Sequence, residues 1–155
     1  MDLALRPTEP FSLESDLALC DDGISFACEP SLYNAVRLSL FCRARALPGD
    51  ELPQGAGAFG EDLGGWWGSA FLSDSGELGS RLWTLRRSAL TDSTRQRARD
   101  FALEALQWLV ETGIASDVLV EPLIPERDVL RLDVTIVRED AADAQFEFDC
   151  LWKEI

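Results

Sequence analysis

Residues 130–136 read Leu-Arg-Leu-Asp-Val-Thr-Ile, and this alternation of apolar and polar residues decides the fold class of the chain. In an extended backbone, successive side chains point to opposite sides, so Leu130, Leu132, Val134 and Ile136 share one side. The polar residues between them share the other side. The pattern predicts a β-strand with one buried face and one solvated face.

Two neighbouring segments repeat this period of two. Before the central strand, one face is formed by Val118, Val120 and Ile124. After it, one face is formed by Phe146, Phe148, Cys150 and Trp152. Residues 125–128 and 139–143 supply the turns between the three segments. The C-terminal part of the chain is therefore predicted to be an antiparallel three-stranded meander.

A long helix is predicted immediately before the meander. Thr91, Asp92 and Ser93 are candidate N-cap residues, and Thr112-Gly113 closes the helix after about residue 111. One stripe of this helix is formed by Ala98, Phe101, Ala102, Ala105, Trp108 and Leu109. A wide apolar stripe of this kind indicates a helix that covers the buried face of the sheet.

The N-terminal region predicts a hairpin followed by a shorter helix. Residues 16–20 and 24–28 are short apolar-rich runs on either side of Asp21-Asp22-Gly23, a turn signal that is typical of β-hairpins. Residues 32–45 carry apolar side chains at helical spacing, with Ser31 as a candidate cap.

Residues 46–79 contain nine of the eleven glycines of the chain, so no long regular element is expected there. The segment also carries Trp66, Trp67 and Phe71, which favour an ordered loop held by aromatic side chains over a disordered linker. Together these elements predict one α+β domain over residues 1–155, with an N-terminal hairpin and helix, a long glycine-rich loop, and a C-terminal meander packed by a long helix.

The charge of the chain argues against nucleic acid and membrane surfaces as partners. The formal net charge is −14, and both of these partners select for clustered lysine and arginine. Residues 81–99 are an exception, because six arginines stand there against one acid, Asp92. A basic stripe on an acidic body suits partners that bind in a defined orientation, although a solvated helix start explains it equally well.

The complete absence of histidine removes the commonest general base, the Ser-His-Asp and Cys-His arrangements, and most zinc sites. The glycine-rich residues 55–60 lack the strand and helix that a dinucleotide-binding loop requires. No cofactor and no metal are therefore expected. Glu61 and Asp62 could form a carboxylate pair for glycoside hydrolysis, but with 28 acidic residues in the chain a solvated acidic loop is the better explanation.

The four cysteines, Cys20, Cys28, Cys42 and Cys150, are scattered without a CxxC pair, and we expect them to be buried free thiols. The N-terminus lacks the basic start and apolar run of a signal peptide, so we expect synthesis in the cytoplasm of the host.

Two short segments place large side chains where another protein could reach them. Residues 64–68 read Gly-Gly-Trp-Trp-Gly, and glycine neighbours allow close approach of a second backbone. Residues 79–87 read Gly-Ser-Arg-Leu-Trp-Thr-Leu-Arg-Arg, with Leu82, Trp83 and Leu85 expected to be buried beside arginines that suit a partner's carboxylates. Local salt bridges are the alternative for these arginines. The candidate protein-interface residues here are Trp66, Trp67, Arg81, Trp83, Arg86 and Arg87.

Several short sequence motifs occur in a characteristic order along the chain. In order, they are residues 1–5, 38–41, 65–68, 79–83, 105–109 with Gly113, and 151–152. Together they resemble the Mu-like phage baseplate wedge family of contractile tails, over nearly the whole chain. The Gly-Trp-Trp-Gly and Gly-Ser-Arg-Leu-Trp words carry most of this likeness. The family is similar to the lysozyme-like wedge subunit of larger contractile tails and to its counterparts in type VI secretion baseplates.

The resemblance implies a structural subunit without catalytic duty, located in the virion tail baseplate, in the inner wedge around the tail tube, where it initiates the sheath. The implied partners are other baseplate wedge proteins, tail sheath subunits, and tail tube or hub proteins, with six copies per baseplate. A sheath subunit could add a strand to the edge of the meander, and residues 145–152 are expected at or next to that edge. This adds Phe146, Phe148 and Trp152 to the candidate protein-interface residues.

Two other functions fit parts of the sequence. A small lysozyme-like muramidase would use a carboxylate pair such as Glu61 and Asp62. The motifs of this chain, however, resemble a family of assembly proteins. An acidic inhibitor or immunity protein that blocks a basic partner would explain the net charge of −14. It would leave the aromatic loop and the arginine stripe unexplained.

Overall fold

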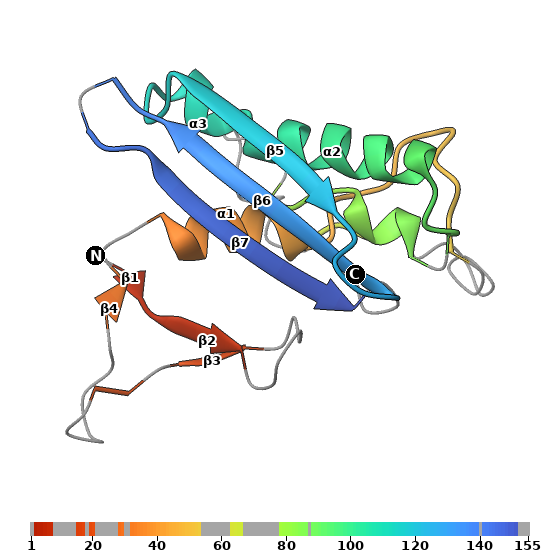
Figure 1. Cartoon of the computed structure of the whole chain (residues 1–155), viewed down its shortest axis with the longest axis horizontal. Coiled ribbons are helices and arrows are strands. Elements are labelled where there is room, and N and C mark those ends of the chain that lie inside the picture. The colour runs from red at the N-terminus through yellow and green to blue at the C-terminus, as the bar shows by residue number, and fades with distance from the viewer. Residues whose placement is uncertain are drawn as a thin grey trace.

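The protein forms one layer of helices on one side of a three-stranded sheet, as Figure 1 shows. This computed structural model describes residues 2–7, 15–17, 19–20, 28–29, 32–53, 63–66, 78–86, 88–139 and 141–151. The other side of the sheet has no covering element among the described residues. The predicted α+β class is confirmed.

The C-terminal sheet consists of β5 (Asp117–Leu123), β6 (Val129–Val137) and β7 (Ala144–Leu151), in the order β5-β6-β7. Both pairings are antiparallel, so the predicted meander is confirmed. Its buried row crosses all three strands, with Val134 opposite Val120 on one side and opposite Phe146 on the other. Ile124 lies beyond the end of β5 and is 36% exposed, so its predicted place on the buried face is wrong.

Of the apolar stripe predicted for the long helix, Ala98, Phe101, Ala102 and Leu109 are buried in the core, whereas Ala105 and Trp108 are only half-buried. The helix begins at α2 (Asp92–Leu106), whose N-cap residue Thr91 accepts a hydrogen bond from the Thr94 N–H, and continues as α3 (Trp108–Glu111). The prediction placed one helix here, whereas the structure has a single-residue break at Gln107. The core joins these helices to the sheet through side chains that are fully or almost fully buried, among them Ala98, Ala102, Leu106, Leu109, Leu130, Leu132, Val134 and Ile136.

A second helix, α1 (Tyr33–Phe41), covers the β7 side of the same face. Its Tyr33 ring stacks on Phe148 with 5.4 Å between centroids. The predicted helix over residues 32–45 is too long at its C-terminal end. After Phe41 the backbone turns extended and pairs with residue 80, because Ser80 N–H donates to the Cys42 carbonyl at 2.9 Å and Ala44 N–H donates back to Ser80 at 3.0 Å.

Most of the predicted hairpin between residues 16–20 and 24–28 lies outside the described residues, which include only residues 16–17, 19–20 and 28 of it. In the described part, β2 (Leu5–Pro7) pairs with β3 (Ser15–Leu17), and β1 (Asp2–Leu3) pairs with β4 (Cys28–Glu29). The N-terminal arm thus supplies the partner strand for both segments, which a turn signal read in isolation does not reveal. The turn at Asp21-Asp22-Gly23 lies outside the described residues.

The glycine-rich loop contains no helix within its described residues 46–53, 63–66 and 78–79. Two backbone hydrogen bonds nevertheless hold residues 63–66 against the segment that follows α1. Ala46 N–H donates to the Leu63 carbonyl at 2.7 Å, and Gly65 N–H donates to Arg43 at 3.1 Å. These bonds fix residues 63–66 through their backbone. Trp67 and Phe71 lie outside the described residues.

Candidate functional site

Among the described residues, no strand pairs with the outer side of β7. The direction of the main-chain groups follows from the register and from the Val137 carbonyl, which accepts from Ser116 N–H at 2.9 Å and so faces β5. Alternate residues of β6 therefore face β7, where they meet Ala144, Phe146, Phe148 and Cys150. The remaining residues of β7 direct their N–H and C=O groups away from the sheet. They are Gln145, Glu147, Asp149 and Leu151.

The opposite edge, β5, is largely closed to a further strand. By the same register, its outward main-chain groups belong to Val118, Val120 and Pro122. Val118 N–H donates to the Asp117 carboxylate at 2.8 Å, and Pro122 has no N–H to donate. Within the part of the chain that the structure describes, the Val120 N–H is the one outward donor of β5 without a partner. β7 carries four and has neither proline nor glycine.

The solvated face of the sheet is acidic across its middle row. Glu121 and Glu147 lie directly opposite Asp133, one on each neighbouring strand. Like charges in directly opposite positions destabilise a sheet, and the Asp133 Oδ1 atom is buried without a hydrogen-bond partner. The next row is better compensated, because the Arg131 guanidinium donates two hydrogen bonds, at 2.6 and 2.7 Å, to Asp149. These bonds raise the pKa of Arg131.

Arg81 links three separate parts of the chain. Its guanidinium donates to Asp50 at 2.9 Å and to Glu104 of α2 at 2.5 Å, and it lies 4.4 Å from the centroid of the Phe101 ring. Partial burial acts to lower the pKa of Arg81, but the hydrogen bonds to Glu104 and Asp50 raise it by more. Arg81 therefore fixes the glycine-rich loop to α2.

The Gly-Ser-Arg-Leu-Trp motif, residues 79–83, makes its contacts within the chain itself. Trp83 is 5% exposed, and its indole N–H donates to the Ala44 carbonyl at 2.8 Å. Gly79 adopts φ +112°, and a Cβ atom there would come within 2.4 Å of the Cys42 carbonyl oxygen. Ser80 Oγ donates to Leu40 at 2.6 Å. The predicted burial of Leu82, Trp83 and Leu85 is confirmed, and all three lie in the 3-10 helix η2 (Leu82–Leu85).

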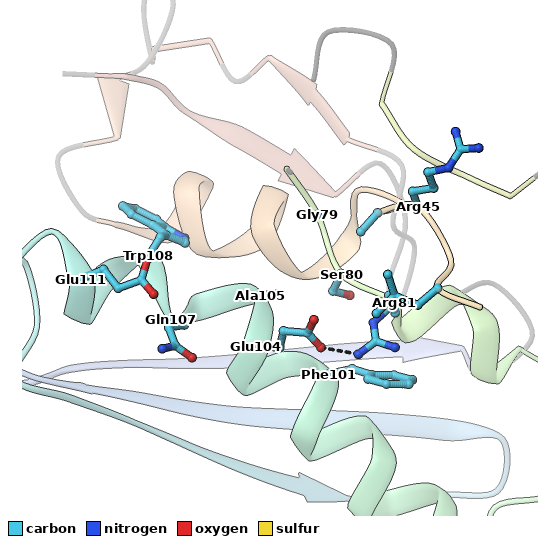
Figure 2. A pocket seen from close by; sticks show the side chains of 12 residues that line it. Arg45, Gly79, Ser80, Arg81, Phe101, Glu104, Ala105, Gln107, Trp108 and Glu111 are labelled. Carbon is cyan, nitrogen blue, oxygen red and sulfur yellow. Dashed lines mark hydrogen bonds and ion pairs between the residues drawn. The ribbon is translucent and has the colours of Figure 1, made fainter. Parts of the chain in front are cut away.

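A cleft of about 420 Å³ runs between α2–α3 and the segment that follows α1 (Figure 2). One wall presents Glu104, Ala105, Trp108 and Glu111 from the helices. The other wall is made by Ala44, Arg45, Leu47 and residues 79–81. Neither the sequence words nor the helical periodicity singled out this cleft, because its two walls are far apart in the sequence.

The predicted interface residues are distributed over three places. Trp66 lies in the glycine-rich loop and is 39% exposed, Arg81 and Trp83 are engaged inside the chain, and Arg86 is half-buried after η2. Phe146 is half-buried and Phe148 is buried on the helix-covered face of β7. Trp67, Arg87 and Trp152 lie outside the described residues. The structure brings Phe146 and Phe148 together, with 6.2 Å between centroids.

Local salt bridges, the alternative explanation for the arginine stripe, account for three of its members. Arg81 pairs as described above, Arg95 pairs with Asp92 at 2.7 Å, and Arg97 lies 3.6 Å from Glu51. Sequence reasoning missed Asp50, Glu51 and Glu104 as the partners. The only signal available was their acidic character, which 28 residues of the chain share.

The described cysteines differ in their surroundings. Cys150 is fully buried, and desolvation raises its pKa to about 12. Cys42 is partly buried, with its pKa raised for the same reason. Cys20 is exposed, which corrects the prediction that it is buried. Among the described residues, no group of three or more candidate ligands could hold a metal ion. The helices in the described ranges are all too short or too polar to span a membrane. Glu61, Asp62 and residues 55–60 lie outside the described residues.

Comparison with known proteins places the chain in a family. A family model described as phage protein GP46 matches residues 32–143. Baseplate protein gp46 of Escherichia phage Mu is 36% identical over 130 residues, which cover 84% of this chain and 86% of the relative. The Mu-like prophage FluMu protein gp46 of Haemophilus influenzae is 34% identical over 139 residues, 90% of each chain. The chain therefore belongs to the phage protein GP46 family, the Mu-like baseplate family that its sequence words resemble.

Proposed function

We propose that this chain is a structural subunit of the baseplate of a contractile phage tail. The observation that carries this proposal is the 36% identity to the Mu baseplate protein over 84% of the chain. We further propose that the chain is not an enzyme, that it occupies the inner wedge around the tail tube of the virion, and that it initiates assembly of the sheath.

The open edge of β7 supports the role in sheath initiation. A strand from a sheath subunit that paired there would gain main-chain hydrogen bonds with Gln145, Glu147, Asp149 and Leu151, largely independently of its side chains. β5 is a poor edge for a further strand, because Pro122 and the Asp117 side chain remove two of its outward N–H donors. Strand addition would therefore occur on one side of the sheet, and this fixes the orientation of the first sheath ring relative to the wedge.

The remaining proposed partners are larger wedge proteins and tail tube or hub proteins, which would bind other surfaces of the chain. We propose six copies of this chain per baseplate. Trp66, the member of the tryptophan pair that the structure describes, is 39% exposed. We propose Trp66, Trp67, Arg86 and Arg87 as contacts with a wedge neighbour, and Phe146, Phe148 and Trp152 as the strand that supports the sheath contact. Arg81 and Trp83 would act there by holding the loop in place.

Replacing Glu147 with proline tests strand addition at β7. Glu147 directs its N–H outward, so Glu147→Pro removes one donor for an added strand while it leaves the hydrogen bonds to β6 in place. Glu147→Ala is the matched control, because it removes the same side chain and keeps the N–H. Electron microscopy of tails assembled with each variant measures sheath length, and quantitative mass spectrometry measures the copies of the chain per baseplate.

We expect both variants to enter baseplates at the parental copy number, and Glu147→Pro alone to leave tubes without sheath. Thermal unfolding of the purified variants establishes that both are folded. Normal sheaths on tails that contain folded Glu147→Pro would refute strand addition at β7. Absence of the parental chain from purified baseplates would refute the baseplate assignment itself.

A further inference from the structure

Two adjacent rows of side chains cross the solvated face of the sheet and end at β7, the strand whose outer side has no partner among the described residues. The first row is Glu121, Asp133 and Glu147, and the second contains Arg131 and Asp149. Both carboxylate oxygens of Asp149 accept hydrogen bonds from Arg131, at 2.6 and 2.7 Å. The second row is therefore neutralised where it reaches β7, whereas the first row reaches it with a negative charge.

The Glu147 carboxylate is only weakly compensated. Its one ion pair among the described residues is with Arg131, whose Nη1 atom lies 3.7 Å from Glu147 Oε2, beyond the length of a hydrogen bond. Its neighbour across the strand pair, Asp133, carries the same charge. The Glu147 side chain is 71% exposed. A cation on the outer side of β7 would therefore meet an accessible carboxylate that lies beside a like charge in its own sheet.

The covered face of β7 presents an aromatic side chain at the same edge. Phe148 is 4% exposed, whereas Phe146 is only half-buried. The Tyr33 ring of α1 packs against both, with its centroid 6.0 Å from that of Phe146 and 5.4 Å from that of Phe148. A strand added to β7 would place a side chain beside Phe146 on this face. An apolar side chain there would remove more of the Phe146 ring from water.

We propose that the strand added to β7 carries a lysine or arginine opposite Glu147 and an apolar residue opposite Phe146. Directly opposite residues of an antiparallel pair point to the same face, with Cβ atoms about 5 Å apart, so the basic side chain reaches the Glu147 carboxylate. The two positions are adjacent in the added strand and point to opposite faces. This proposal rests on the strand addition proposed above and specifies the side chains of the sheath segment.

The charge of the same edge disfavours pairing with a second copy of this chain. β7 carries Gln145, Glu147 and Asp149 on its solvated face and contains no basic residue. Two antiparallel copies of β7 join the most outward residues in registers centred on Glu147, Phe148 or Asp149. In each of these registers at least one carboxylate faces another, and like charges in opposite positions destabilise a strand pair. The edge therefore selects a basic segment over a copy of itself.

A pair of charge reversals tests the pairing at Glu147. Glu147→Lys and Glu121→Lys make the same change in net charge, and both place a lysine directly opposite Asp133. Only residue 147 borders a strand added to β7. The measurement is the concentration of sheath subunit at which half of the purified tube-baseplate particles carry a sheath. We expect Glu147→Lys to raise this concentration about fivefold and Glu121→Lys to change it less than about twofold.

A neutral variant, Glu147→Gln, measures the same charge pair without introducing a new charge. We expect it to need about twice the parental concentration of sheath subunit. Its requirement should also depend less on salt than that of the parental chain, because salt screens an exposed ion pair. Thermal unfolding checks that each variant is folded, and Glu147→Gln decides the question if Glu147→Lys does not fold. Equal requirements for folded Glu147→Lys and Glu121→Lys, or a parental salt dependence in Glu147→Gln, would overturn the pairing.

Photocrosslinking in assembled tails identifies the residues of the added strand. Gln145 and Leu119 are exposed residues of one row, on β7 and β5. We expect benzoylphenylalanine in place of Gln145 to crosslink to a sheath segment with a basic residue, next to an apolar one, about two positions from the residue it faces. The same group in place of Leu119 should not reach that segment. A sheath segment without this pair of residues, a second copy of this chain, or no crosslink to the sheath subunit would each contradict the proposal.

The outcomes separate this inference from the function on which it rests. If Glu147→Pro blocks the sheath but Glu147→Lys and Glu121→Lys behave alike, strand addition stands and the side-chain chemistry proposed here fails. If tails that contain folded Glu147→Pro carry normal sheaths, strand addition itself fails. If the parental chain is absent from purified baseplates, the baseplate function fails.

Discussion

The two edges of the sheet begin from the same backbone geometry and end with opposite properties. β5 and β7 both pair with β6 along nearly their whole length, and both leave alternate main-chain groups pointing outward. On β5, a proline and a carboxylate remove two of the three outward donors. On β7, all four outward donors have no partner among the described residues. A few side chains, without any change in pairing, thus decide which edge can accept another strand.

The two faces of the sheet differ as strongly as its edges. The covered face is a continuous apolar core in which Leu130, Leu132 and Ile136 are completely buried. The solvated face carries a row of three carboxylates and a bidentate pair between Arg131 and Asp149. Stability therefore comes from one face, while the other face and the β7 edge are free to carry recognition.

The largest effect is expected from a substitution in β6, the central strand that pairs with both edge strands. Leu132 lies in the middle of β6 and is completely buried, so Leu132→Ala loses buried apolar area and leaves a cavity. We expect the free energy of unfolding to fall by about 3 kcal/mol. Leu119→Ala, at a 51% exposed position on β5, should cost less than about 0.5 kcal/mol. Urea titrations followed by circular dichroism measure both, and similar losses would contradict the division between the two faces.

A second prediction concerns the inward side of β7. Burial raises the pKa of Cys150 from 9.0 to about 12, so its neutral thiol is favoured in the folded state. Below pH 9 this contribution is fully present. As the pH rises above 9, the unfolded chain ionises its thiol while the folded chain does not, so stability falls, by about 2 kcal/mol at pH 10.5 relative to neutral pH.

Comparison with Cys150→Ala isolates this contribution, because the variant lacks the thiol and should show a shallower decline in stability between pH 9 and pH 10.5. At pH 8, iodoacetamide should modify the exposed Cys20 and leave Cys150 intact in the folded protein. Rapid modification of Cys150 in the folded chain, detected by peptide mass spectrometry, would show that the inner side of β7 opens readily.

A third prediction opens the closed edge. Replacing Pro122 with threonine and Asp117 with alanine restores two outward N–H groups on β5. Because the parental chain already has an open β7 edge, the double variant has two, and we expect β5 of one molecule to pair with β7 of another. Sedimentation equilibrium should show a higher average mass than that of the parental chain at equal concentration. A variant that associates no more than its parent would mean that other features close β5.

The smallest effect is expected from removing one charge from the acidic row on the solvated face. Asp133 stands between Glu121 and Glu147 and has a buried oxygen without a hydrogen-bond partner. Asp133→Asn removes the central charge, and we expect it to raise the free energy of unfolding by about 0.5 kcal/mol. The gain should shrink at 1 M salt, where exposed charges are screened. Loss of stability in urea titrations of Asp133→Asn would contradict the like-charge account.

The sequence by itself determined the elements whose signals are local and periodic. The alternation in residues 130–136 and in its neighbours specified the meander, because a half-buried strand must place apolar side chains at every second position. The Thr91 cap and the apolar stripe similarly specified the long helix, and the words at residues 65–68 and 79–83 were sufficient to indicate the family. Boundaries that depend on distant partners were not specified, as the early end of α1 at Phe41 shows.

Only the tertiary structure decided which groups meet. The partners of Arg81 come from residues 31 and 23 positions away, and the N-terminal arm pairs with residues 15–17 and 28–29. The open edge at β7, the closed edge at β5 and the cleft beside Trp108 all follow from register or from packing between distant segments. Local sequence patterns report the direction of side chains along one element, whereas these surfaces depend on the relative position of several elements.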